Sequence, residues 1–200
     1  MDNYILNEVG NNNSIDVAEN VDVSKLSIDI RGNNNSISIK SDCIINDLYI
    51  RFLGDDNHIE IGDSCKIAGR FLFDGSSQKL NIGRLTTFER VGIVVAEGTS
   101  VSIGEDCMFS YGIQLRTTDA HSIIDLTTGK RSNQAQSLHV GNHVWVGAEA
   151  IIQKGTKIPN NSIVGIRSVV SGKFYNDNIA IAGVPAKIVK EMIDWDRKLI

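Results

Sequence analysis

The chain has 200 residues, a formal net charge of −4 and an aromatic content of only 6%. This length suits one domain with its own core, the charge gives no electrostatic basis for binding nucleic acid, and no apolar run approaches the roughly 18 residues of a membrane span. The N-terminus lacks the basic start and apolar core of a signal peptide, and an odd number of cysteines, three, fits a reducing compartment, so we expect a soluble cytoplasmic protein.

The N-terminal part of the chain repeats at a fixed interval. The hexapeptide GNNNSI occurs at Gly10–Ile15 and again 22 residues later at Gly32–Ile37. Similar segments begin at Gly54, after 22 residues, and at Gly75, after 21. Such an interval is typical of a solenoid, in which each unit packs only on its neighbours. A duplicated flexible linker would not need to stay in register with the isoleucines on both sides.

A six-residue period lies inside each unit. Aliphatic or aromatic residues recur at this spacing in four runs: Ile61, Ile67 and Phe73; Ile82, Phe88 and Val94; Ile103, Phe109 and Leu115; and Val140, Val146, Ile152, Ile158, Val164 and Val170. The residue four places after each of the first five members of the last run is small or β-branched, from Val144 to Ser168. Neither a helix nor simple strand alternation gives this pattern. It predicts an all-β fold, a triangular parallel β-solenoid of hexads with GNNNSI as an extruded corner.

The cysteines share one position in the repeat. Cys43, Cys65 and Cys107 occupy the fifth place of a unit's first hexad, as does Thr86. They should therefore stack in one column as small buried side chains. Their spacing resembles no zinc-ligand pattern, and we expect no metal site.

One unit is much longer than the others. Ile103 and Val140 are 37 residues apart, against 21 from Ile82 to Ile103, so about 16 residues are inserted within 116–136. Long loops on rigid scaffolds are often functional. This one contains His121, which could take a proton from a hydroxyl, and Asp119, which could fix its tautomer. The alternative is a surface histidine in a polar loop.

The C-terminal segment has a different pattern. Val184, Ile188, Met192 and Trp195 follow spacings of four, four and three, with Pro185 near the first turn. This predicts a short α-helix that covers an open end or side of the solenoid. The predicted organisation is therefore a solenoid over residues 1–180, with its loop at about 116–136, and a C-terminal extension with a helix over 181–200.

Several of these segments resemble a known family. The hexads, the loop TTDAHSIID, the segment HVGNHVWVGAEAIIQKGTKIPNNSIVGIRSVV and the ending IAGVPAKIVK are similar to the hexapeptide-repeat acyltransferases, and most of all to members that O-acetylate polysialic acid and other surface sugars. The resemblance is most specific over roughly residues 100–190. It implies a left-handed β-helix and a homotrimer with active sites between subunits.

The resemblance also assigns roles to residues. It makes His121 the general base, which deprotonates an acceptor hydroxyl that then attacks acetyl-CoA directly, with Asp119 or a backbone carbonyl orienting the ring. Trp145 would lie against the thiol end of acetyl-CoA, with His121 supplied by the neighbouring subunit. The remaining candidates for cofactor binding are small residues along the pantetheine and cations for its phosphates: Gly147, Ala148, Gly165, Arg167, Lys173, Lys187 and Lys190. Arg167 departs from the family pattern, in which a small residue is usual.

We therefore predict an acetyl-CoA-dependent O-acetyltransferase acting on a cell-surface carbohydrate. Acetylation of a small metabolite, an amino-sugar or an antibiotic is an alternative. A γ-class carbonic anhydrase is a weaker one, because the spacing of His139 and His143 does not match that family's histidine pair. A non-enzymatic solenoid would not need the histidine loop.

Overall fold

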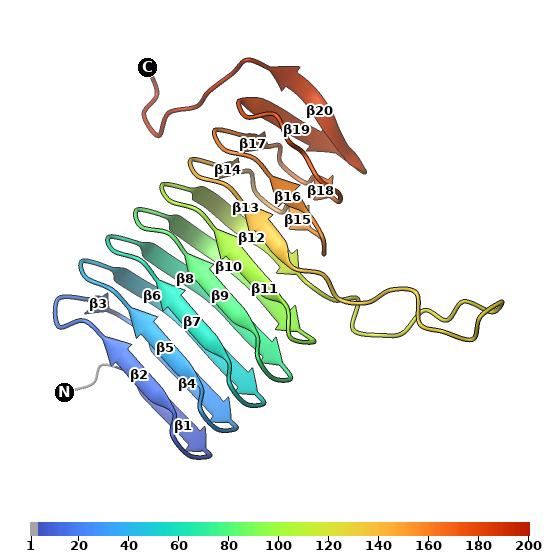
Figure 1. Ribbon diagram of the computed structural model, residues 1–200. Coiled ribbons are helices and arrows are strands. Elements are labelled where there is room, and N and C mark those ends of the chain that lie inside the picture. The colour runs from blue at the N-terminus through green and yellow to red at the C-terminus, as the bar shows by residue number, and fades with distance from the viewer. Residues whose placement is uncertain (1–3) are drawn as a thin grey trace.

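The computed structural model describes residues 4–200, in which every regular element is a β-strand (Figure 1). Thirteen strands form one sheet: β1 (Ile5–Val9), β3 (Asp22–Val23), β4 (Leu26–Arg31), β6 (Ile44–Leu53), β8 (Lys66–Asp74), β10 (Thr87–Ala96), β12 (Met108–Arg116), β14 (Trp145–Val146), β15 (Ile151–Ile152), β17 (Ile163–Val164), β18 (Val169–Val170), β19 (Ile179–Gly183) and β20 (Ala186–Glu191). Seven form a second: β2 (Ser14–Val17), β5 (Ser36–Ile39), β7 (His58–Ile61), β9 (Lys79–Ile82), β11 (Ser100–Ile103), β13 (Leu138–Val140) and β16 (Lys157–Ile158). The predicted parallel β-solenoid is confirmed.

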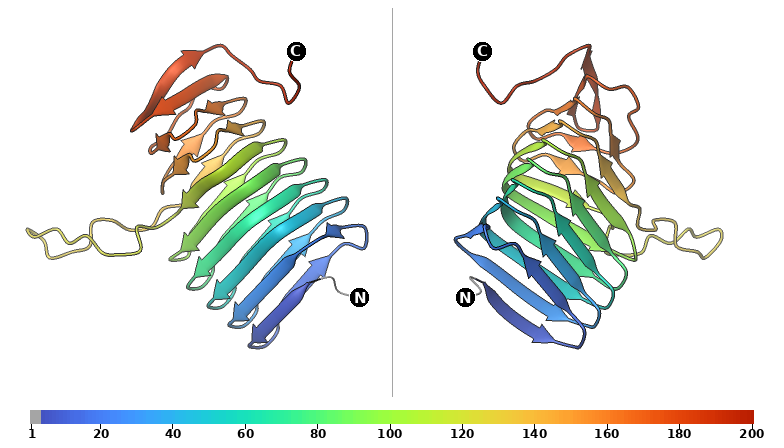
Figure 2. Two further views of the ribbon diagram at one scale, coloured as in Figure 1. Left: turned by 180° about the vertical axis from the view of Figure 1, so that it is seen from behind. Right: turned by 60° about the vertical axis from the view of Figure 1, so that its left-hand side comes forward.

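Each coil of the solenoid has three sides. The seven-stranded sheet forms the first face. The long strands of the other sheet bend where their pairing shifts register, as between Ile45 and Leu48 of β6, and so supply two further sides. We call the side that carries Trp145 the Trp face and the side after the bend the third face. The coils stack with parallel pairing on all three sides (Figure 2).

The predicted interior is confirmed with one correction. Nearly all the hexad aliphatics are buried in one continuous core along the solenoid axis. The prediction that Val94 fills the interior is wrong. Val94 is only half-buried and faces outward, while Ile93 and Val95 point inward. The pairing of β10 shifts register beside Val91, so the strand contains an irregularity that a strict six-residue count does not anticipate.

The GNNNSI corners are held by a ladder of buried amides. The side-chain oxygen of Asn13 accepts hydrogen bonds from the backbone and side-chain nitrogens of Asn35, at 2.9 and 3.0 Å. Asn35 accepts from the backbone of Asn57, and Asn57 from that of Gln78, both at 3.0 Å. Because Asn35 and Asn57 are buried, their amides need partners and find them in the neighbouring coils, and the ladder ends at Gln78, whose Oε1 has no partner among the described residues. The polar repeat is therefore structural.

The glycine of this corner is required by the close approach of successive coils. Gly32 has φ +150°, and a Cβ atom there would lie 2.0 Å from the carbonyl oxygen of Gly54. Gly10 and Gly54 meet the following coil in the same way. No side chain fits at such a contact without moving a neighbouring backbone.

The predicted column of cysteines is also confirmed. All three thiols are free and buried. Those of Cys43 and Cys65 donate to the carbonyl oxygens of Gly62 and Gly83 in the next coil, at 3.1 and 3.2 Å. In the following coil the hydroxyl of Thr86 does the same toward Gly104, at 2.9 Å. A thiol and a hydroxyl are thus equivalent here, as small donors to a neighbouring coil.

The predicted C-terminal helix is wrong. β19 continues the solenoid by pairing parallel to β17, across the predicted boundary at residue 180, and then turns back into the antiparallel strand β20. The turn contains the cis Val184–Pro185 bond. Helical spacing is overridden here because β19 leaves an unpaired edge that β20 satisfies, and Ile188 and Val189 are β-branched and suit a strand.

The corner glycines give a test of the repeat. Gly32→Ala should lower the free energy of unfolding by about 2–3 kcal/mol, because the new methyl group must displace the backbone of the next coil. The matched control is Gly98→Ala, where φ is +68° and the nearest backbone atom would lie 3.9 Å from the methyl group. Denaturant unfolding of both variants measures the difference. Equal losses would contradict the role assigned to close coil approach.

Candidate active site

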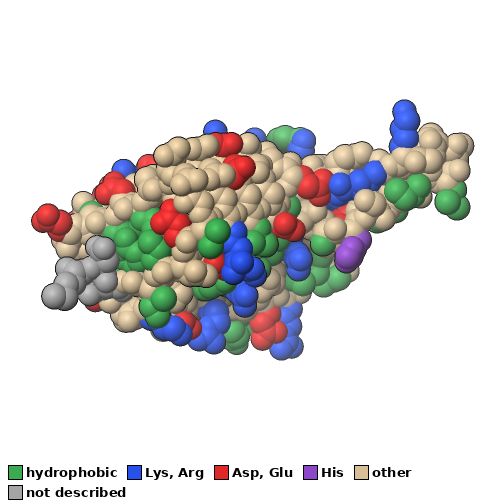
Figure 3. Space-filling view, turned by 90° about the horizontal axis from the view of Figure 1, so that it is seen from below, with side chains coloured by type: hydrophobic (Ala, Val, Ile, Leu, Met, Phe, Trp, Pro, Cys, Tyr) green, Lys and Arg blue, Asp and Glu red, His purple; other side chains and the backbone are tan. Residues whose placement is uncertain are grey.

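The inserted loop follows β12 and ends before β13, so it occupies residues 117–137. It projects from the corner where the third face meets the first (Figures 1 and 2). Hydrophobic and charged side chains lie along the projection (Figure 3). Among them Leu126 is 96% exposed, and Ile123 and Ile124 are also exposed. Exposed apolar side chains gathered on one extended arm are typical of an interaction surface.

An ion pair anchors the loop to the preceding coil. The guanidinium of Arg131 donates two hydrogen bonds to the carboxylate of Glu97, at 2.7 and 2.9 Å. Thr118 adds a third, at 2.9 Å. These contacts, that with Arg131 foremost, lower the pKa of Glu97 to about 2. The loop is therefore held at its base by an ionised carboxylate.

Asp119 does not orient the ring of His121 within the chain, as the sequence had suggested. Its carboxylate instead accepts hydrogen bonds from the Lys154 ammonium at 2.5 Å and from the Asn133 amide at 2.8 Å. Both contacts, the one with Lys154 first, lower the pKa of Asp119. The Asn133 amide also donates to the His121 carbonyl oxygen at 2.8 Å. Asp119 thus fixes the backbone around the histidine, and only indirectly its side chain.

His121 itself is exposed near the base of the loop. Its backbone N–H donates to the carbonyl oxygen of Asp119 at 2.8 Å. Its imidazole forms no hydrogen bond within residues 4–200, so both ring nitrogens are available to a substrate.

Trp145 opens β14 on the Trp face, with its indole 38% exposed. A hollow beside it is lined by the predicted small residues Gly147, Ala148 and Gly165, together with Ser110 and Ile166. A Cβ atom at Gly147 would lie 2.7 Å from the Ile166 backbone nitrogen. The structure therefore brings together the tryptophan and the small residues that the sequence proposed for the cofactor.

His121 and Trp145 lie on different sides of the solenoid. The loop leaves the corner between the third and first faces, and the Trp face is the side opposite that corner. The hollows beside Trp145 are lined by residues of the coils alone. Asp119 and Lys154 line a separate hollow at the base of the loop. One chain therefore does not bring the two predicted catalytic side chains together.

The predicted phosphate-binding cations are dispersed. Lys190 pairs with Ala180, which continues the row Trp145–Ile163 across successive strands. Three strand spacings place its backbone about 14 Å from that of Trp145. Lys187 lies beside it on β20, whereas Lys173 bridges to Lys157 on the first face. Arg167 is exposed and paired with Glu149 at 2.6 Å.

Comparison with known proteins decides the family. No protein-family model matches the chain. The crystal structure of the polysialic acid O-acetyltransferase OatWY is 38% identical in sequence, with a TM-score of 0.92 over 98% of this chain and 92% of that one. The chain belongs to the hexapeptide-repeat acyltransferase family. The polysialic acid-specific acetyltransferase NeuO is 32% identical, with a TM-score of 0.89 over 99% of this chain and 91% of that one.

Two curated relatives of this hexapeptide-repeat chain are also named polysialic acid O-acetyltransferase. The polysialic acid O-acetyltransferase of Neisseria meningitidis is 38% identical over 124 residues, which cover 62% of this chain and 58% of the relative. That of Escherichia coli O1:K1 is 37% identical over 119 residues, covering 60% of this chain and 38% of the relative. The chain thus spans 58% or less of the curated relatives it matches first.

The described residues contain neither a metal-binding cluster nor a membrane-spanning helix. No cluster of three or more histidine, cysteine, aspartate or glutamate residues within 4–200 is arranged to hold a metal ion. The same residues contain no helix long and apolar enough to cross a membrane.

Several residues around the candidate active site of this hexapeptide-repeat chain were not predicted from the sequence. Lys154 and Asn133 hold the loop base but lie 35 and 14 positions from Asp119, so no local motif connects them. Trp195, predicted on a helix face, lies against Trp145, with ring centroids 6.2 Å apart. The composition could have indicated a role for Trp195, because the chain has only two tryptophans and the other is Trp145.

The anchor of the loop can be tested by proteolysis. Glu97→Gln should make trypsin cleave after Lys130 and Arg131 several times faster, because the variant replaces a charge-assisted bidentate contact with a weaker neutral one. Glu149→Gln is the control, since it removes a similar ion pair outside the loop. Cleavage rates at neutral pH, followed by mass spectrometry, give the comparison. Equal rates for the Glu97 variant and the unaltered chain would contradict the anchoring role.

Proposed function

We propose that this chain transfers the acetyl group of acetyl-CoA to a hydroxyl of a sialic acid polymer or a related surface carbohydrate. The observation that carries the proposal is the 38% identity and TM-score of 0.92 to a polysialic acid O-acetyltransferase over 98% of the chain. Two relatives with the same name in different bacteria add to it. A cytoplasmic location is the corresponding proposal for where the reaction takes place.

The proposed chemistry is direct transfer with His121 as general base. A neutral imidazole nitrogen accepts the proton of the acceptor hydroxyl while the oxygen of that hydroxyl attacks the thioester carbonyl carbon. The C–S bond then breaks, the ester remains on the sugar, and the coenzyme A thiolate takes up the proton. General-base help of this kind contributes about 10²- to 10⁴-fold to the rate. The unpartnered ring of His121 and its fixed backbone suit this role.

The donor fits the hollow beside Trp145. Pantetheine needs backbone partners and room, which Gly147, Ala148 and Gly165 supply. Along the row that continues from Trp145, the backbone of Lys190 lies about 14 Å from that of Trp145, and its ammonium is the candidate partner for the phosphates, with Lys187 three residues away on the same strand. Lys173 is a poorer candidate because it lies on another face.

A second copy would complete the site. The loop points away from its own Trp face and exposes three large apolar side chains, so we propose a homotrimer in which each loop lies against the Trp face of the next subunit. His121 of one subunit would then meet Trp145 of another. This arrangement explains why the two residues lie on different sides of one chain.

A second hollow favours an anionic polymer over a small metabolite, amino-sugar or antibiotic. It is lined by Tyr49, Arg70, Arg90, Gly112 and neighbouring residues, and Gly112 lies two positions along β12 from Ser110, which lines the hollow beside Trp145. The Arg70 guanidinium lies 4.9 Å above the Tyr49 ring. Among residues 4–200 neither arginine lies within ion-pair distance of a carboxylate, so both can bind carboxylates of the polymer, although Asp47 also lines the hollow, where Lys25 foremost and Arg90 in addition lower its pKa. A single small acceptor would not reach this far.

Subunit mixing tests the shared site. His121→Ala and Trp145→Ala should each lose nearly all turnover of acetyl-CoA with an acceptor, measured by thiol release. Co-expressed in equal amounts, the two variants should recover about a quarter of the normal activity, because about one interface in four pairs an intact histidine with an intact tryptophan. Each variant alone is the control. Absence of recovery in a mixed trimer of normal stability would contradict a site between subunits.

Acceptor length tests the arginine hollow. Replacing Arg70 and Arg90 together by alanine should raise the KM for long polysialic acid about two- to tenfold at low salt, as expected for two exposed charge pairs. The KM for short oligomers should change less, and added salt should reduce the difference. Lys79→Ala, on the first face, is the control. Equal effects on long and short acceptors would exclude the hollow from polymer binding.

A further inference from the structure

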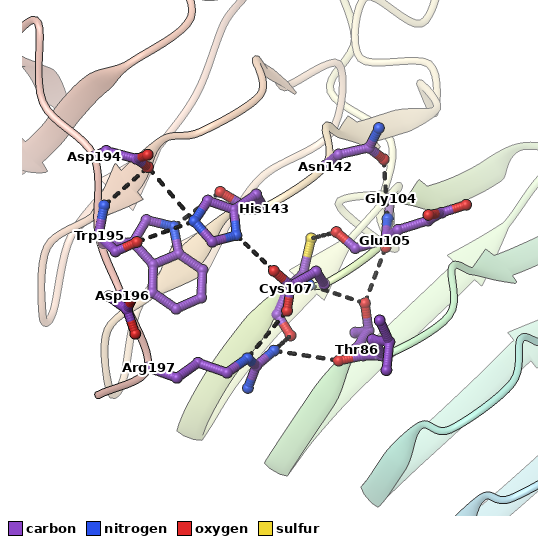
Figure 4. A network of polar contacts seen from close by, with 12 residues as sticks. Thr86, Gly104, Glu105, Cys107, Asn142, His143, Asp194, Trp195, Asp196 and Arg197 are labelled. Carbon is purple, nitrogen blue, oxygen red and sulfur yellow. Dashed lines mark hydrogen bonds and ion pairs between the residues drawn. The ribbon is translucent and has the colours of Figure 1, made fainter.

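The last residues of the chain run back over earlier coils. After β20, the segment Trp195–Arg197 crosses the corner between the first face and the Trp face (Figure 4). The Arg197 guanidinium donates to the Asp106 carboxylate at 3.1 Å, the Thr87 hydroxyl at 3.0 Å, and the carbonyl oxygens of Leu85 and Cys107 at 3.2 and 3.0 Å. One side chain thus ties the C-terminal segment to coils about 90–110 residues earlier in the sequence.

Trp195 docks on His143 in the same corner. The two rings are stacked, with centroids 4.3 Å apart and an interplanar angle of 11°. The indole N–H donates to the His143 carbonyl oxygen at 2.9 Å. As a result Trp195 is only 8% exposed, although the residues on either side of it are exposed.

Both ring nitrogens of His143 face oxygen acceptors. Nδ1 lies 2.7 Å from an Asp106 carboxylate oxygen, and Nε2 lies 3.0 Å from the Trp195 carbonyl oxygen. A neutral imidazole has a single N–H, so it can satisfy only one of these acceptors; the imidazolium satisfies both. The geometry is therefore complete only when His143 is protonated.

The charges around His143 act in the same direction. Asp106 on the preceding coil and Asp194 on the C-terminal segment face the ring, the latter at 3.5 Å, while Arg197 pairs with the other oxygen of Asp106. Burial lowers the pKa of His143, but the hydrogen bonds with Asp106 and the Trp195 carbonyl, together with the two carboxylates, outweigh it and raise the pKa above its usual value. A raised pKa means that the contact is stable at acidic pH and is lost as pH rises through that value.

Trp195 is also a neighbour of the proposed donor site. Its ring centroid lies 6.2 Å from that of Trp145, with an interplanar angle of 46°. The Arg197 guanidinium donates to the hydroxyl of Thr87, and Thr87 lines a further hollow beside Trp145, distinct from the arginine hollow, together with Met108. The docked segment therefore lies beside the Trp145 indole, at the edge of the site and outside the lining of either hollow.

We propose that Trp195 is a positioning residue for the donor site: docked on protonated His143 and tied down by Arg197, it holds the Trp145 indole in place for the acyl donor. The segment Trp195–Arg197 is a proton-dependent latch. The role of the latch in donor binding rests on the proposed function, whereas the latch itself does not.

Fluorescence tests the latch independently of activity. Trp145→Phe leaves Trp195 as the sole tryptophan, because the chain has two. Acrylamide should quench Trp195 weakly at about pH 6 and several times more strongly at about pH 9, above the ordinary histidine pKa. Adding Arg197→Ala should give strong quenching throughout, and adding His143→Gln should abolish the pH dependence. Weak quenching in all variants at every pH would overturn the latch.

Kinetics tests what the latch does. Arg197→Ala, with both tryptophans present, should raise the KM for acetyl-CoA about fivefold or more with a smaller change in kcat, and Arg197→Lys should recover part of the loss. If Arg197→Ala made Trp195 accessible to acrylamide but left the KM for acetyl-CoA unchanged, the positioning role would be overturned. The segment would then have only a structural role. If the unaltered chain used no acetyl-CoA, the proposed function would fail while the quenching experiment still decided whether the latch exists.

Discussion

Register between successive coils is the constraint on which the rest of this structure depends. Parallel strands stacked at about 4.8 Å must keep equivalent residues opposite each other on three sides at once. Where coils approach too closely for a Cβ atom, as at Gly32, the sequence supplies glycine; where a buried amide faces the next coil, as at Asn35, it supplies another amide. A unit can therefore change length only at a corner, because an insertion within a face would break pairing on both neighbours.

This constraint determines where function can be placed. A stacked coil offers flat sides whose outward residues lie in rows, so a site needs a departure from the repeat. Two departures exist: the long corner that carries His121, and the row in which Trp145 stands among smaller side chains. Since they lie on different sides of a closed coil, we propose that a second subunit unites them, and the exposed apolar side chains of the loop support such a partner.

The sequence predicted what periodicity encodes. The solenoid, the GNNNSI corners, the column of Cys43, Cys65 and Cys107 and the place of the insertion all follow from intervals, because neighbouring units impose the same geometry on each other. The predicted inward orientation of Val94 was wrong because a register shift in β10 changes which residues face the interior there. The C-terminal helix was wrong because an unpaired edge strand decides the conformation of its neighbour, whatever the spacing of its apolar residues. The contacts of Asp119 with Lys154, and of Trp195 with His143, join residues 35 and 52 positions apart outside any repeat.

The end of the chain combines two physical requirements. The last coil needs its edge paired, and β20 does this; the residues after it are then free to run back over the corner that adjoins Trp145. The resulting arrangement sets opposite demands on two histidines. His121 can accept a proton only as neutral imidazole, while His143 satisfies both of its acceptors only as imidazolium. Rising pH therefore weakens the docking of Trp195 beside the proposed donor site, because the imidazolium of His143 loses its proton. The carboxylate of Asp106 opposes this loss, because its hydrogen bond stabilises the charged form of His143, and its pairing with Arg197 holds that carboxylate in place.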